Sequence, residues 1–159
     1  MRKRIIGQVA TPQEARPDVT WLDLESIAQV EATSEDPAFP IENALTVQEG
    51  LGGWRAAEPG EQLVRILFDA PRAVHRIKLH FVEEQLERTQ EFVLRWTAKG
   101  SDPLQQIVCQ QWNFSPTGST SEIEDYQVNL AEVAVLELAI KPDISNGSAR
   151  ASLAAWRVA

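Results

Sequence analysis

The chain has 159 residues, a formal net charge of −8 and 43% hydrophobic residues, and a chain of this length can bury roughly 70% of the surface that its unfolded form exposes. The acidic balance excludes nucleic acid as a partner and disfavours an anionic membrane surface, because no basic stripe is present to displace counterions from phosphates. The single cysteine, Cys109, excludes an internal disulfide. It lies in the strand-like run Gln106-Ile107-Val108-Cys109-Gln110, and we expect a buried thiol.

The first residues differ from the rest. Residues 1–20 contain Pro12, Pro17 and scattered charge, and we expect them to form a loosely attached arm on a single domain that spans residues 21–159. The apolar run after Arg2-Lys3-Arg4 is too short for a signal peptide, and no stretch approaches the ~20 apolar residues of a membrane span. We therefore expect a bacterial-type cytoplasmic location.

Alternation of apolar and polar residues, the period of half-buried strands, dominates from about residue 63. Taken in chain order, we predict strands at 27–33, 63–68, 74–82, 91–98, 104–114, 123–128, 136–140 and 149–158, with short helical turns at 41–45 and 83–88. The expected apolar faces consist of Val64, Ile66 and Phe68; Ile77, Leu79 and Phe81; Phe92, Leu94 and Trp96; and Leu136, Leu138 and Ile140. Turn sequences such as Asp69-Ala70-Pro71 separate the strands. The fold class is therefore all-β, an antiparallel β-sandwich of about eight strands.

Several segments stand in a particular order along the chain. They are Ala32-Thr33-Ser34-Glu35, the turn from Pro40 to Leu45 leading to Gly53-Trp54-Arg55, Phe68-Asp69-Ala70-Pro71, the strand from Phe92 to Gly100, and the closing strand from Ala149 to Val158. In this order and spacing, residues 27–159 resemble a discoidin domain, also called the coagulation factor V/VIII C-type domain. That family shares the galactose-binding-like jelly roll with many carbohydrate-binding modules. The resemblance implies a jelly roll whose binding loops gather at one end, here the loops around 46–56, 83–90, 111–120 and 143–150.

Candidate ligand-binding residues come from these loops. Trp112 and Asn113 lie where a strand meets the turn Ser115-Pro116-Thr117-Gly118, and an exposed indole beside an amide suits the face and hydroxyls of a sugar. Trp54 either plugs one end of the sandwich or presents its ring to a ligand.

Arg88 stands where the resemblance implies a basic ligand contact, and its fork of donors suits hydroxyls or a carboxylate. The competing interpretation, slightly favoured, is a salt bridge to Glu84 or Glu91. The remaining ligand-binding candidates are Glu84, Arg55, Asn146 and Arg150.

Nothing in the sequence indicates covalent chemistry. His75 and His80 lie five residues apart, so regular pleating sends them to opposite faces of a strand. No nucleophile elbow, zinc helix or spaced carboxylate pair is recognisable. Several discoidin-like domains hold a structural calcium, but no Asp-x-Asp-x-Asp-Gly loop occurs here, so we expect no cofactor, with calcium as the alternative.

The sequence thus predicts a non-catalytic binding module rather than an enzyme. Its expected ligand is a carbohydrate, held by loops at one end of the sandwich. The alternative is a protein–protein interaction or scaffold module of a cytoplasmic complex, which would use the same loops or an edge strand against a partner or against its own copy.

Overall fold

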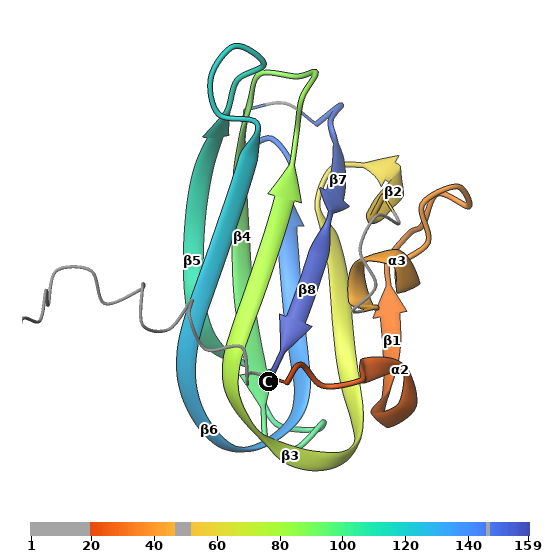
Figure 1. Ribbon diagram of the computed structural model, residues 1–159, viewed down its shortest axis with the longest axis vertical. Helices are drawn as coiled ribbons and strands as arrows, with labels where there is room; N and C mark the ends of the chain where they lie inside the picture. Colours follow the sequence, from red (N-terminus) through yellow and green to blue (C-terminus); the bar gives the residue numbers. More distant parts are fainter. Residues whose placement is uncertain (1–19, 47–51, 146) are drawn as a thin grey trace, which may run out of the picture.

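A computed structural model describes residues 20–46, 52–145 and 147–159, and the predicted amino-terminal arm lies almost wholly outside this range. The described elements are mostly strands, with two single-turn helices (Figure 1). In chain order they are α2 (Leu24–Ile27), β1 (Ala28–Ala32), α3 (Glu42–Leu45), β2 (Trp54–Pro59), β3 (Gln62–Val82), β4 (Arg88–Thr97), β5 (Gln105–Phe114), β6 (Ser121–Lys141), β7 (Arg150–Leu153) and β8 (Ala155–Val158). The predicted class, an antiparallel sandwich of about eight strands, is confirmed.

Two long strands, β3 and β6, build both layers of the sandwich. They pair antiparallel over almost their whole length and bend together, with register shifts between Leu67 and Arg76 (Figure 1). The first half of β3 and the second half of β6 form one layer with β1, β4 and β5, whereas the other halves form the facing layer with β8. A separate two-stranded sheet pairs β2 with β7.

The bend corrects one prediction from the sequence. Asp69-Ala70-Pro71 was expected to separate two strands, but these residues lie inside β3, and the predicted strands 63–68 and 74–82 are halves of it. Proline lacks a donor and irregular pairing increases strand twist, so the segment turns the strand without ending it. Strands 123–128 and 136–140 are likewise parts of β6.

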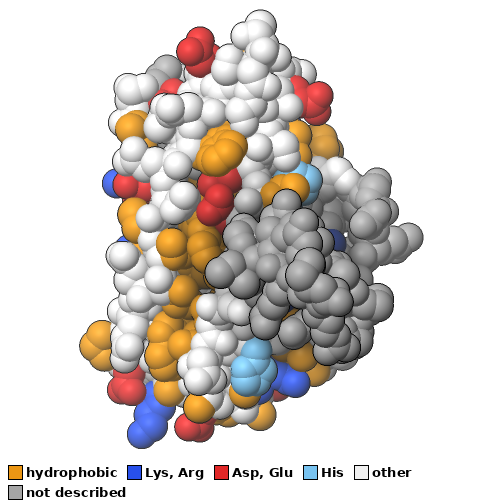
Figure 2. Space-filling model, turned by 60° about the vertical axis from the view of Figure 1, so that its left-hand side comes forward, with side chains coloured by type: hydrophobic (Ala, Val, Ile, Leu, Met, Phe, Trp, Pro, Cys, Tyr) orange, Lys and Arg blue, Asp and Glu red, His pale blue; other side chains and the backbone are white. Residues whose placement is uncertain are grey.

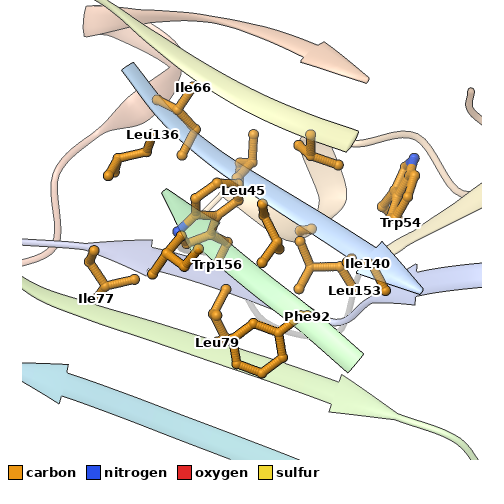
Figure 3. Packing of buried hydrophobic residues seen from close by; sticks show 14 of the residues in the cluster. Leu45, Trp54, Ile66, Ile77, Leu79, Phe92, Leu136, Ile140, Leu153 and Trp156 are labelled. Atoms are coloured by element: carbon orange, nitrogen blue, oxygen red, sulfur yellow. The ribbon is translucent and has the colours of Figure 1, made fainter. Parts of the chain in front are cut away.

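The core lies between the layers and follows the predicted period. Ile66, Ile77, Leu79, Phe92 and Leu136 are among the apolar residues buried there, and they converge around Trp156 (Figure 3). The four predicted apolar faces are buried except for one residue, Trp96, which is half-buried and packs against the rim of the core. Its neighbour on the adjacent strand is Gln105, the first residue of β5, so little sheet extends beyond it.

One side of the sandwich carries apolar side chains close to the surface. A band of hydrophobic groups runs along the side where β5 and the first half of β6 lie (Figure 2). Half-buried residues of these strands pack against the core there: Ile107, Val108, Trp112, Tyr126, Val128 and Leu130.

Cys109 is exposed, so the expectation of a buried thiol is wrong. It shares the outward phase of β5 with Gln111 and Asn113, while Trp112 and Phe114 take the inward phase.

The structure confirms one of the two predicted helical turns and corrects the other. The turn at 41–45 is confirmed by α3. The turn at 83–88 is wrong, because residues 83–87 form an irregular loop between β3 and β4 that is held by side-chain contacts to its own backbone. That loop forms one wall of the candidate site.

Candidate functional site

A pocket of about 430 Å³ opens at the end of the sandwich where β2, β7 and the β3–β4 loop meet. Three segments far apart in sequence supply its walls: the loop before α3, the β2–β7 sheet and residues 82–86. The lining residues used below are Phe39, Arg55, Glu84, Leu86, Arg150 and Ser152. Of the loops expected to converge, those around 46–56, 83–90 and 143–150 contribute described residues to the pocket.

The β2–β7 pair sets which side chains reach the pocket. Trp54 lies opposite Leu153 and Arg55 lies opposite Ser152. Because neighbours along a strand alternate in direction, Trp54 and Leu153 are buried, whereas Arg55 and Arg150 are exposed. Arg150 and Ser152 share the exposed face of β7, and Arg55 lies opposite Ser152, while the register shifts between Arg55 and Pro59, the residue opposite Arg150.

A glycine brings β2 close enough to β7 for this arrangement. Gly53 has φ +72°, and a Cβ added there would lie 2.5 Å from the carbonyl oxygen of Leu153 and 2.8 Å from the Cα of Ala154. Only glycine adopts this backbone conformation without strain while leaving that space empty. The residue at position 53 is thus constrained by both conformation and packing.

The loop before α3 supplies an aromatic ring. The backbone N–H of Arg55 donates to the Phe39 carbonyl at 3.1 Å, and the N–H of Asp36 donates to the Arg55 carbonyl at 2.8 Å. These bonds hold the loop against the start of β2. The guanidinium carbon of Arg55 lies 5.0 Å from the centre of the Phe39 ring, within the range of a cation–π contact.

Glu83 shapes the opposite wall. Its carboxylate accepts hydrogen bonds from the backbone N–H groups of Gln85 (3.1 Å) and Leu86 (3.3 Å) and from Nε of Arg88 (2.8 Å). Burial raises the pKa of Glu83, but the hydrogen bonds from Arg88 and from the backbone outweigh it and lower the pKa overall. The β3–β4 loop is therefore ordered around a carboxylate that stays ionised at neutral pH.

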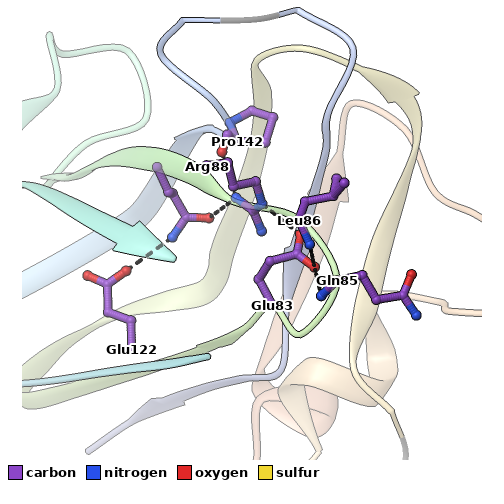
Figure 4. A network of polar contacts seen from close by, with 7 residues as sticks. Glu83, Gln85, Leu86, Arg88, Glu122 and Pro142 are labelled. Carbon is purple, nitrogen blue, oxygen red and sulfur yellow. Dashed lines mark hydrogen bonds and ion pairs between the residues drawn. The ribbon is translucent and has the colours of Figure 1, made fainter. Parts of the chain in front are cut away.

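Arg88 continues this network inward (Figure 4). Its Nη1 donates to the Pro142 carbonyl at 2.6 Å and to the Gln90 side chain at 3.3 Å, and the guanidinium lies over the Phe114 ring. Gln90 in turn donates to Glu122 at 3.2 Å. Burial and then the nearby charge of Glu124 raise the pKa of Glu122 to about 7. Thus Arg88 joins the pocket loop, the end of β6 and a buried acid.

These positions correct two of the predicted site residues. The Arg88 side chain is only 1% exposed, so it cannot present donors to a ligand. Its ionic partner is Glu83, not Glu84 or Glu91. Trp54 is 1% exposed, and its indole N–H donates to the Ser34 carbonyl at 3.1 Å. Of the two expected roles for Trp54, its burial favours the plug, although the residue is among those that line the pocket.

The other predicted site residues divide into two groups. Arg55, Glu84 and Arg150 line the pocket together. Trp112 and Asn113 lie outside it on β5, where the half-buried indole donates to Ser119 Oγ at 3.1 Å and Asn113 accepts from Thr89 at 2.6 Å. Asn146 lies outside the described residues. A ligand-binding role for any of these residues stays a prediction.

Sequence analysis missed Phe39. It stands between two prolines in Asp36-Pro37-Ala38-Phe39-Pro40, and a large aromatic residue in such a loop cannot follow strand alternation into the core. An aromatic residue between two prolines was therefore the sequence signal that could have identified Phe39. No sequence signal indicated Ser152, because its position opposite Arg55 is set only by the pairing of β7 with β2.

A cluster of His, Cys, Asp or Glu side chains that could hold a metal ion is not found among the described residues. Within residues 20–46, 52–145 and 147–159, no three His, Cys, Asp or Glu side chains lie close enough to hold a metal ion. In the same part of the chain, no helix has the length and apolar character needed to cross a membrane.

The fold is that of known carbohydrate-binding modules. The chain is similar to the family 32 module of Clostridium perfringens NanJ, solved with galactose, at 12% identity and a TM-score of 0.63 over 87% of this chain and 97% of that one. It is also similar to the family 32 module of AlyQ, solved with 4,5-unsaturated mannuronic acid, at 17% identity and a TM-score of 0.63 over 89% and 98% of the two chains.

A third similar structure is chitosan-binding module 1 from a chitosanase/glucanase of Paenibacillus sp. IK-5, at 16% identity and a TM-score of 0.58 over 87% of this chain and 98% of that one. No protein-family model and no curated protein matches the sequence. At these identities the comparisons establish the galactose-binding-like jelly roll that the sequence resemblance implied.

Proposed function

We propose that this protein is a non-catalytic carbohydrate-binding module, and that the sugar enters the pocket between β2, β7 and the β3–β4 loop. The observation that carries the proposal is the pocket itself, because segments from distant parts of the chain bring an aromatic ring, two guanidinium groups and an exposed carboxylate to one concave surface. Sugars are bound by such combinations of an apolar surface and convergent polar groups. The similar structures named above include modules solved with sugars.

Binding would be weak. The pocket is open and its polar groups remain hydrated without a ligand, so we expect dissociation constants of about 0.1–1 mM, equivalent to about −4 to −5.5 kcal/mol. Screening on a glycan array, followed by isothermal titration at millimolar sugar, measures such affinities. The absence of binding to every sugar at these concentrations would contradict the proposal.

Two variants separate the pocket from the earlier candidate on β5. Ser152→Tyr places a bulky side chain between Arg55 and Arg150 and should abolish binding at the pocket. Trp112→Ala should leave the affinity unchanged, because the indole lies outside the pocket. The reverse pattern, in which only Trp112→Ala removes binding, would assign the sugar to the β5 surface instead.

A protein–protein interaction module is the second candidate, and the edge of β5 favours it. In the described part of the fold β5 pairs only with β4, and its ten residues include neither a charged residue nor a proline. Edge strands normally carry such residues to prevent strand addition. A second copy of this chain could pair along β5 without charge repulsion, in spite of the net charge of −8.

Light scattering on the purified chain tests this alternative. A dimer that dissociates in Gln111→Lys, with Lys placed on the outward phase of β5, would support it. A monomer at all concentrations would exclude self-association through this edge. Neither result bears on sugar binding in the pocket, so the two candidates can be judged separately.

A further inference from the structure

Among the described residues, the two arginines of the pocket have no ionic partner. Neither Arg55 nor Arg150 forms an ion pair with a described carboxylate, although acidic residues outnumber basic ones by 23 to 15. Four other arginines do form such pairs: Arg65, Arg76, Arg88 and Arg95. One wall of the pocket therefore carries two exposed guanidinium groups that no described carboxylate neutralises.

Both guanidinium groups belong to residues that line the pocket. Arg55 lies opposite Ser152, and Arg150 shares one face of β7 with Ser152, two residues away. The register of β2 shifts between Arg55 and Pro59, the residue opposite Arg150. Because diagonal neighbours in a regular antiparallel pair lie about 7–8 Å apart at Cα, within the reach of long side chains, we expect both arginines to reach a single small anion in the pocket.

Phe39 supports one of these groups instead of offering a free stacking surface. The Arg55 guanidinium lies over the Phe39 ring at 5.0 Å, which leaves its N–H donors directed outward in the plane of the group. Arg55 thus covers one face of the Phe39 ring. The aromatic residue of the pocket therefore orients a cation and reduces the entropy that Arg55 loses on binding an anion.

The opposite wall has a different character. Glu83 is engaged by Arg88, and Glu84 is exposed and forms no ion pair with a described residue. A carboxylate such as Glu84 accepts hydrogen bonds from sugar hydroxyls but repels an anion. The pocket is polarised, with a cationic wall on β2–β7 and an acceptor wall on the β3–β4 loop.

We propose that the saccharide bound here carries a carboxylate, as a uronic acid residue does, and that Arg55 and Arg150 bind this group while Glu84 accepts hydroxyl donors from the same ring. This inference rests on the proposed carbohydrate-binding function. The planar fork of an arginine matches the two oxygens of a carboxylate in a bidentate pair. A sulfated sugar shares the negative charge but has a tetrahedral group, and the experiment distinguishes the two.

Matched sugars that differ only at one carbon provide the test. Isothermal titration compares galacturonic acid with galactose, glucuronic acid with glucose, and mannuronic acid with mannose, with galactose 6-sulfate as the sulfated probe. We expect at least one acidic sugar to bind about tenfold more tightly than its neutral partner, because charge-assisted hydrogen bonds replace neutral ones. The preference should weaken as salt is added.

Variants then assign the preference to the two arginines. Arg55→Gln and Arg150→Gln should each remove most of it, and Arg150→Lys should retain only part, since lysine keeps the charge but loses the fork. Lys99→Gln is the matched control, because it removes the same charge from an exposed residue that lies two positions beyond the end of the ten-residue strand β4, away from the β3–β4 loop.

Each other outcome counts against the inference in a distinct way. Equal binding of acidic and neutral sugars, or a preference that survives both glutamine variants, would overturn it and leave the proposed function intact. Tighter binding of galactose 6-sulfate than of every uronic acid would overturn the carboxylate assignment. If no sugar binds in any pair, the proposed function itself fails, and this inference with it.

Discussion

Arg88 offers the sharpest test of how this end of the sandwich is held together. Arg88→Met keeps a long apolar stem against the Phe114 ring but removes the charge. The variant loses the 2.8 Å contact to Glu83 and the 2.6 Å hydrogen bond to the Pro142 carbonyl. Glu83 and the Pro142 carbonyl each lose one hydrogen-bond donor, and no neighbouring group of the protein takes its place. We expect the folded state to be strongly destabilised.

The magnitude follows from these two contacts. A buried hydrogen bond to a charged group contributes about 1.5–3 kcal/mol, so losing both costs about 3–6 kcal/mol. Breaking a buried ion pair by removing one partner costs a similar amount, about 3–5 kcal/mol. Urea unfolding followed by tryptophan fluorescence measures this loss. With a slope of about 2–3 kcal/mol/M, the midpoint should fall by about 1–3 M.

Arg150→Met is the matched control. Arg150 is exposed and has no described ionic partner, so its replacement should change the free energy of unfolding by at most about 0.5 kcal/mol. If Arg88→Met costs less than about 1 kcal/mol, or no more than Arg150→Met, the role assigned to the Arg88 network is refuted.

Acid provides an independent check on the same network. The pKa of Glu83 is lowered in the folded state, so its contribution to stability is present above its unfolded pKa and is lost as the pH falls through the folded value. In Arg88→Met the main interaction that lowers this pKa is gone. The variant should therefore lose less stability on acidification than the parent protein does, and urea midpoints measured as the pH is lowered toward 3 would show a smaller decline.

Three further predictions concern other parts of the fold. The pKa of Glu122 is raised to about 7, so its contribution to stability is present below its unfolded pKa and is lost as the pH rises through 7. In urea unfolding, the parent protein should therefore lose on the order of 2–3 kcal/mol of unfolding free energy between pH 5 and 8, and Glu122→Gln should not. An equal pH dependence of the two proteins would contradict this. Gly53→Ala should lower the free energy of unfolding by about 2–4 kcal/mol, because alanine is strained at a positive φ and its Cβ clashes with the Leu153 carbonyl. A thermal midpoint equal to that of the parent protein would contradict this, because it would mean that β7 moves away without cost. Cys109 is exposed, so Ellman's reagent should react with it as fast in the native protein as in the urea-unfolded chain, and protection of the native thiol would contradict the placement of β5.

The candidate site was predictable only in part. Arg55, Glu84 and Arg150 were named from their expected places in strand-end loops, and the structure brings them to one pocket. Arg88 came from the same reasoning, yet its side chain turns inward. A sequence pattern places a residue in a loop, but whether that loop's side chains face solvent depends on what packs beneath them. Here Phe114 and Pro142, from β5 and the end of β6, supply the buried partners.

The sequence by itself determined the fold class and nearly all of the core, because alternation of apolar and polar residues is a local property of each strand. Val64, Ile66, Leu79 and Leu138 could be assigned to the core from their neighbours alone. Only the tertiary structure decided that β3 continues through Pro71 and that Arg55 and Arg150 share one wall of a pocket. These features depend on pairing between segments separated by many residues, and no local pattern records which strands become neighbours or how a loop packs on them.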